Sequence, residues 1–122
     1  MKTLNEIVNE AKKPKMEKVY RLIHTHYPLH GDKRTYTLEG SLRELIDACS
    51  YTLEVGESWQ HEKGNKKINR NPKNMKALCT NLENAKNNAA RNGYSGDSYD
   101  FEEIGEREVL EPNPDSNVKE AE

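Results

Sequence analysis

The stretch SLRELIDACSYTLEVGESWQHEKG (41–64) carries the pattern that decides the fold. Ser41 and Glu44 have the spacing of a capping box, in which a hydroxyl and a carboxylate satisfy free N–H groups at the start of a helix. Apolar and small residues then recur at intervals of three and four, as on one face of a helix: Leu42, Leu45, Ile46, Cys49, Leu53 and Gly56. The pattern predicts one long helix that ends near Gly64.

A second apolar stripe lies beside the first on this predicted helix. Its members are Ala48, Tyr51, Val55 and Trp59. Two stripes on one helix indicate that it is covered from two sides. We expect a second helix on one side and a sheet on the other.

The second helix is expected downstream, beginning at Asn71-Pro72. An asparagine cap followed by proline at the first helical position is a typical start signal, and Asn92-Gly93 is a typical stop. Between them runs a regular apolar face: Met75, Leu78, Cys79, Leu82, Ala85 and Ala89. We expect the two helices to form an antiparallel hairpin that buries Leu45, Ile46, Cys49, Leu78, Cys79 and Leu82.

Strands are expected on both sides of this helical region. Residues 17–27 and 33–39 are rich in β-branched and aromatic residues and flank the turn residues 30–32, which predicts a β-hairpin. Residues 98–104 read as a third strand, and a capping box at Thr3 to Glu6 predicts a short first helix closed by Pro14. The predicted order is α-β-β-α-α-β. It corresponds to an α+β fold, with the helix hairpin packed on an antiparallel sheet of about three strands.

Composition is consistent with one small domain. The chain has 122 residues, of which 33% are hydrophobic and 33% charged, and its net charge is −2. We assign residues 1–105 to a single domain and expect 106–122 to be an acidic, disordered tail. No apolar run reaches the ~18 residues of a membrane helix, and the N-terminus lacks the apolar centre of a signal peptide. The expected location is the cytoplasm.

The stretch HEKGNKKINRNPKNMK (61–76) is strongly basic. It contains five lysines and one arginine against one glutamate. Positive side chains beside the free N–H groups of a helix start attract phosphate, and aromatic rings nearby offer faces on which a base can stack. The residues of this candidate site are Trp59, His61, Lys66, Lys67, Arg70 and Lys73. The alternative interpretation is a solvated interhelical loop.

Polar residues follow one flank of the predicted second helix. The candidate partner-binding residues among them are Asn81, Asn84, Asn88 and Arg91. Asparagine is a poor helix former because its amide competes for backbone hydrogen bonds. We therefore expect each amide to have a partner, which the protein's own loops and sheet, a second subunit of a homodimer, or another macromolecule would supply.

Metal and catalytic chemistry find little support in the sequence. His24 and His26 share one face of a predicted strand and His30 lies in the turn, so the three imidazoles could hold zinc. No nearby carboxylate supplies an obvious second shell, and the spacing matches no closed zinc motif. The favoured interpretation is a polar surface, with no metal and no cofactor. Cys49 and Cys79 fall on core stripes, and no glycine-rich phosphate loop occurs. We expect no enzymatic activity.

The stretch SYTLEVGESWQHEKGNKKINRNPKNMKALCTNLENAKNNAARNGYSG (50–96) resembles small uncharacterised accessory proteins of tailed bacteriophages. The resemblance implies a context rather than residues: such proteins are often non-enzymatic and bind a host protein, a nucleic acid or a signalling nucleotide.

Two functions are therefore expected from different classes. The first is a small non-enzymatic phage-type protein in the host cytoplasm that binds and neutralises a host protein, as in counter-defence. The alternative is a nucleotide-binding or nucleic-acid-binding protein that uses residues 61–76, for example to sequester a phosphorylated signalling nucleotide. Neither involves a membrane, and a homodimer is compatible with both.

Overall fold

A computed structural model describes residues 15–90 and 96–109. The described residues fall into two compact units: residues 18–105 belong to one, and residues 15–17 and 106–109, from the two chain ends, belong to the other. The expected first helix within residues 1–14, the Asn92-Gly93 stop and the tail from residue 110 onward lie outside the described residues.

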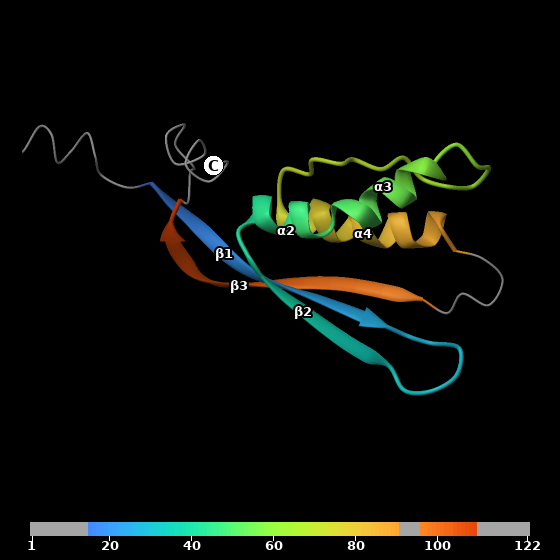
Figure 1. Ribbon diagram of the computed structural model, residues 1–122, viewed down its shortest axis with the longest axis horizontal. Helices are drawn as coiled ribbons and strands as arrows, with labels where there is room; N and C mark the ends of the chain where they lie inside the picture. The colour runs from blue at the N-terminus through green and yellow to red at the C-terminus, as the bar shows by residue number, and fades with distance from the viewer. Residues whose placement is uncertain (1–14, 91–95, 110–122) are drawn as a thin grey trace, which may run out of the picture. The chain divides into compact units, whose positions relative to one another are not determined.

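The sheet has three strands: β1 (Met16–His26), β2 (Arg34–Gly40) and β3 (Asp97–Glu108). β1 lies in the middle, pairs antiparallel with β2, and has β3 running in the opposite direction on its other side (Figure 1). The predicted hairpin and third strand are confirmed. Gly31 supplies the left-handed turn conformation between β1 and β2, with φ of 98°, a value that other residues adopt only with strain.

β3 is longer than the sequence predicted. It continues to Glu108, so the expectation that the tail begins at residue 106 is wrong for residues 106–108. In the unit formed by the chain ends, Arg107 Nε donates to Glu17 Oε1 at 3.1 Å, and the N–H of Val109 donates to the carbonyl of Lys15 at 2.8 Å. Both contacts join residues that are far apart in the sequence, so local sequence signals could not predict them.

The strand register assigns the two faces of the sheet. Leu22 lies opposite Leu38, and His24 lies opposite Tyr36. Because Leu22 is 2% exposed and belongs to the core, these four residues share the face toward the helices. Arg21 lies on the other face, where it forms ion pairs with Glu39 on β2 and Glu102 on β3.

Three helices lie over one face of the sheet in the larger unit: α2 (Leu42–Ala48), α3 (Ser50–Ser58) and α4 (Met75–Asn88) (Figure 1). The described order is β-β-α-α-α-β. The capping box at α2 is confirmed, since the Ser41 hydroxyl accepts from the N–H of Glu44 at 3.3 Å and the Glu44 carboxylate accepts from the N–H of Ser41 at 3.0 Å.

The prediction of one long helix over 41–64 is wrong. The chain leaves the helical conformation at Cys49, with φ of −100° and ψ of 9°, and α3 ends at Ser58. After it come tight turns, in which the N–H groups of Trp59 and Gln60 donate to carbonyls three residues earlier. The second apolar stripe is covered only in part: Tyr51 is 76% exposed, whereas Val55 and Trp59 are part-buried.

The predicted start of the second helix is wrong as well. α4 begins at Met75, and its cap is Asn74, whose side-chain oxygen accepts from the N–H of Ala77 at 2.8 Å. Because Asn74 already satisfies the helix end, Asn71-Pro72 lies in the preceding loop, where Pro72 is buried. The helix ends at Asn88, before the predicted stop.

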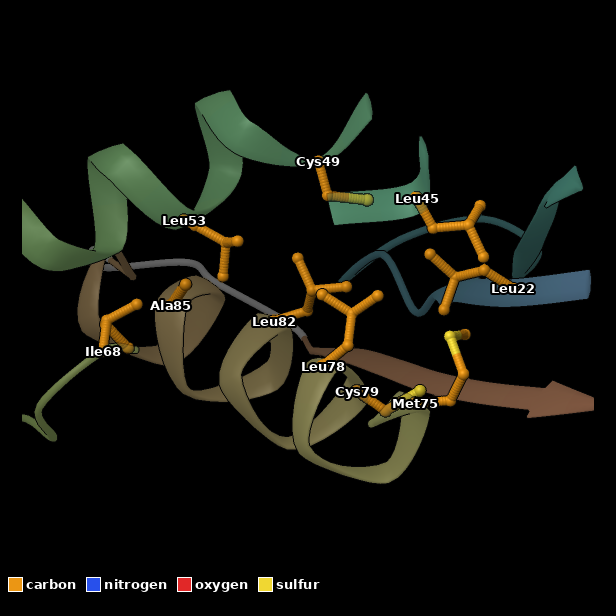
Figure 2. Close-up of a cluster of buried hydrophobic side chains, with 10 residues drawn as sticks. All are labelled: Leu22, Leu45, Cys49, Leu53, Ile68, Met75, Leu78, Cys79, Leu82 and Ala85. Carbon is orange, nitrogen blue, oxygen red and sulfur yellow. The ribbon is translucent and has the colours of Figure 1, made fainter. Parts of the chain in front are cut away.

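The core lies between α2, α3, α4 and the sheet (Figure 2). Burial of Leu45, Cys49, Leu78, Cys79 and Leu82 is confirmed, whereas Ile46 is only partly buried. The sheet contributes Leu22, and the connection between α3 and α4 contributes Ile68, which is 3% exposed.

One contact brings α3 and α4 unusually close. A Cβ atom placed on Gly56 would lie 2.3 Å from the Cβ and 2.4 Å from the Cα of Ala85. Such distances are far shorter than van der Waals contact, so only a residue without a side chain fits at position 56 while α4 keeps its place. The approach also places the Gly56 carbonyl within reach of Asn88.

Candidate functional site

The candidate site is the connection between α3 and α4, residues 59–74, here named the basic loop. It contains most of the cations that the sequence singled out, and it has no helix or strand of its own. A connection of this length without regular structure is uncommon in a compact domain unless it is functional or loosely ordered. Side-chain hydrogen bonds fix its backbone at several points.

Asn88 is the principal anchor of the basic loop. Its side-chain oxygen accepts from the N–H of Lys66 at 2.9 Å, and its amide nitrogen donates to the carbonyls of Lys66 at 2.7 Å and Gly56 at 3.1 Å. The side chain is 3% exposed. Three hydrogen bonds from one buried amide tie the last turn of α4 both to the loop and to α3.

Further side chains hold the loop on either side of this anchor. Asn65 donates to the carbonyl of Trp59 at 2.7 Å and to that of Asn88 at 3.3 Å. Gln60 accepts from the N–H of Ile68 at 3.0 Å, and Asn81 accepts from the N–H of Asn69 at 2.7 Å. The buried Ile68 and Pro72 add apolar contacts, so the loop backbone has a defined conformation.

The polar flank of α4 is thus used to shape the protein itself. The expectation that the asparagine amides have partners is confirmed for Asn81 and Asn88, and the partners are the basic loop and, for Asn81, also the carbonyl of Ala77. Asn84 is part-buried, and Arg91 lies outside the described residues. The amides of Asn81 and Asn88 are occupied by these internal hydrogen bonds. The exposed cations of the basic loop are therefore the part of the predicted site that a ligand can contact.

Those cations project into solvent. Lys66, Lys67 and Lys73 are exposed, as is His61, whereas the Trp59 side chain is part-buried. The Arg70 guanidinium lies 3.3 Å from the Glu57 carboxylate. A hollow of about 490 Å³, lined by Glu57, Lys67, Ile68, Asn69 and Arg70, opens beside this ion pair. The structure thus brings Lys67 and Arg70 together around one concave surface.

The three histidines do not form a shared site. The Asp97 side chain, 2% exposed, lies 2.5 Å from His24 Nε2 and 3.1 Å from His26 Nδ1, and the His24 ring stacks on Tyr99 at 4.3 Å. His30 is in the exposed turn. Within residues 15–90 and 96–109, no group of three or more metal-ligating side chains could hold an ion. Sequence reasoning missed Asp97 because only the pairing of β1 with β3 brings it to the histidines.

His24 and Cys49 line one hollow of about 190 Å³ between sheet and helices. Burial raises the pKa of the Cys49 thiol, and burial together with the nearby carboxylates of Asp100 and Glu83 raises the pKa of Cys79 to about 12. A nucleophilic cysteine needs the opposite shift, toward the thiolate. Both thiols are therefore buried core groups in an environment that disfavours the thiolate.

We expect slow labelling of both cysteines in the native protein. Cys49 is 9% and Cys79 is 7% exposed, so a maleimide should react with them only after urea unfolds the chain. Because the pKa of Cys79 is raised in the folded state, the free energy of unfolding depends on pH. The contribution of this thiol is fully present below its ordinary pKa of 9.0 and is lost as the pH rises toward about 12. Rapid modification of either thiol at neutral pH without denaturant would contradict the packing of α2 and α4.

None of the helices in the described part of the chain combines the length and apolar character that a bilayer span requires. Comparison with known proteins gives no assignment, since no protein-family model, curated protein or solved structure matches the chain significantly.

Proposed function

We propose that the protein is a non-catalytic binding protein that engages an acidic surface of a partner protein through the basic loop. In the context implied by the phage resemblance, the partner is a host protein that this binding neutralises. The observation that supports the proposal is the anchoring of the loop by Asn65, Asn81 and Asn88 while its lysines stay exposed.

Anchoring matters because binding has an entropic cost. A loop that must become ordered on association loses part of the interaction free energy, and one that is already ordered does not. The anchors take up backbone groups of the loop, so Lys66 and Lys67 start from a defined backbone. A loop that served only as a connection would not need an amide as buried as that of Asn88.

The positive charge of the basic loop determines that the proposed partner surface is acidic. The chain as a whole carries −2, so a long polyanion would be repelled by much of the surface, whereas a local acidic patch on a protein would meet only the loop. Exposed charges of opposite sign increase the association rate and select the partner more than they increase affinity. Binding through this loop should weaken as salt screens it.

The test reverses the charge of the loop. The double variant Lys66→Glu with Lys67→Glu should lose the protein that wild type captures from a bacterial lysate, and affinity for that purified partner should fall on the order of tenfold or more. Folding should be unchanged, because exposed charges contribute little to stability. The matched control carries Lys15→Glu and Arg43→Glu, two exposed cations outside the loop, and should bind normally. Equal loss of binding in both double variants would refute a role specific to the loop.

A second candidate is a small phosphorylated ligand, favoured by the hollow between Lys67 and Arg70. Its volume of about 490 Å³ is within the usual range for small-molecule sites, and a ligand phosphate would compete with Glu57 for Arg70. Titration with nucleoside polyphosphates should then change the fluorescence of Trp59, the single tryptophan, and added salt should suppress the change. A fluorescence signal that is unaffected by nucleotides at low salt would leave protein binding as the function.

A further inference from the structure

Strand β2 is an open edge of the sheet. The strand order is β2-β1-β3, and within the described residues no other segment forms backbone hydrogen bonds with the outer side of β2. Residues 34–39 are all exposed. An open edge presents N–H and C=O groups on which a further strand can form, and natural proteins usually protect it with proline, a bulge or central charges.

None of these protections occurs in the middle of β2. Residues 35–38 are Thr-Tyr-Thr-Leu, without proline or charge. Pairing with β1 is regular, because consecutive residues from Arg34 to Gly40 lie opposite consecutive residues of β1. The strand therefore has no bulge. The edge also carries two large apolar side chains, Tyr36 at 50% and Leu38 at 46% exposure.

We propose that β2 pairs antiparallel with β2 of a second copy of this chain, about a two-fold axis through Thr37. An antiparallel edge pair is related by a two-fold axis perpendicular to the sheet, which keeps both helix layers on one side and pairs residues of the same face. Thr37 is the middle of the strand Arg34–Gly40. The register centred there is the one that pairs every residue of the strand.

Side chains in this register complement one another. Tyr36 would lie opposite the partner's Leu38, and symmetry would repeat the pair, so the two exposed apolar residues of each edge cover each other. Side chains directly opposite each other on one face of a strand pair are in contact, and burying their apolar surface is stabilising. A register centred on Tyr36 would instead place Arg34 opposite the partner's Leu38, and would leave part of the strand unpaired.

Charges are complementary as well. On the opposite face Thr35 would lie opposite the partner's Glu39, with Lys33 on the adjacent diagonal. Opposite charges in such positions stabilise a strand pair, and like charges directly opposite destabilise it. No like charges meet in this register. The inference concerns a surface separate from the basic loop and does not depend on the loop's function.

The register can be tested by charge, using the full chain and sedimentation velocity. Wild type should sediment as a dimer at micromolar concentrations. Thr37→Lys and Thr37→Glu should each give monomers because equal charges meet at the axis, and an equimolar mixture of the two variants should restore a dimer. Thr35→Lys is the matched control: it meets the partner's Glu39 and should keep the dimer.

Three results would overturn the proposal: a monomeric wild type, a Thr37→Lys variant that remains dimeric, or a Thr35→Lys variant as monomeric as Thr37→Lys. Both threonines are exposed, so the variants should fold, and circular dichroism melting would show this.

Cross-linking tests the axis itself. In Thr37→Cys the two new thiols would face each other, with Cα atoms about 4.5–5.5 Å apart, which lies within the disulfide range of about 4.4–6.8 Å. Mild oxidation should give a covalent dimer rapidly. Thr35→Cys should not cross-link, because each new thiol would lie opposite Glu39 of the partner subunit. Cross-linking of Thr35→Cys at the rate of Thr37→Cys would refute the register.

Discussion

Replacing Leu82 with alanine is expected to lower the free energy of unfolding by about 2–5 kcal/mol. Leu82 is 0% exposed and lies in the cluster formed by α2, α3 and α4 (Figure 2). The variant loses the transfer free energy of the γ carbon and its two methyl groups, and it leaves a cavity that the helices close only in part. Since small domains have a total stability of about 5–15 kcal/mol, urea denaturation should show a large fall in the midpoint.

The matched control is Leu29→Ala, in the turn between β1 and β2. Leu29 is 60% exposed, so the same truncation there should change the midpoint little. Similar losses in the two variants would mean that the cluster is not the core of the protein.

Asn88→Ala is expected to have the second large effect, and to act on the loop as well as on stability. The truncation leaves the N–H and the carbonyl of Lys66 without their partner, whereas the Gly56 carbonyl still accepts from the N–H of Trp59. Each such group that water does not reach costs about 1–3 kcal/mol. We expect a fall in the free energy of unfolding comparable to that of Leu82→Ala, together with faster amide exchange at Lys66.

Asn87→Ala is the control for this experiment. Asn87 is the preceding residue of α4 and is exposed, so the substitution has the same effect on helix propensity without removing a loop anchor. It should be neutral or slightly stabilising, since alanine is the better helix former. If Asn88→Ala were equally neutral, the basic loop would not depend on this side chain, and the argument from preorganisation would fail.

Local signals in the sequence predicted the fold where a few neighbouring residues determine the structure. The capping box of Ser41 and Glu44 and the hairpin turn at Gly31 are of this kind. The break at Cys49 could not be read in the same way, because the apolar spacing continues through it and packing against other elements, not local propensity, sets the bend. The cap at Asn74 was missed because Asn71-Pro72 offered a stronger local signal a few residues earlier.

The candidate site was predictable in its charges but not in its construction. The sequence indicated where the lysines lie and that the asparagines need partners. It could not show that Asn88 reaches back to Lys66 and Gly56, because such a contact depends on how α3 and α4 are packed. The same limit applies to Asp97, which only the sheet order places beside His24 and His26.

The close approach of Gly56 to Ala85 has a consequence for how this sequence can diverge. A Cβ atom on residue 56 would lie 2.4 Å from the Cα of residue 85, so even a glycine at 85 would leave no room for it. A larger residue at 56 therefore demands a shift of α4. A shift of α4 would displace Asn88 and the loop with it. In distant relatives we therefore expect glycine to persist at position 56 while the surrounding surface drifts, which makes it a better mark of descent than the basic residues.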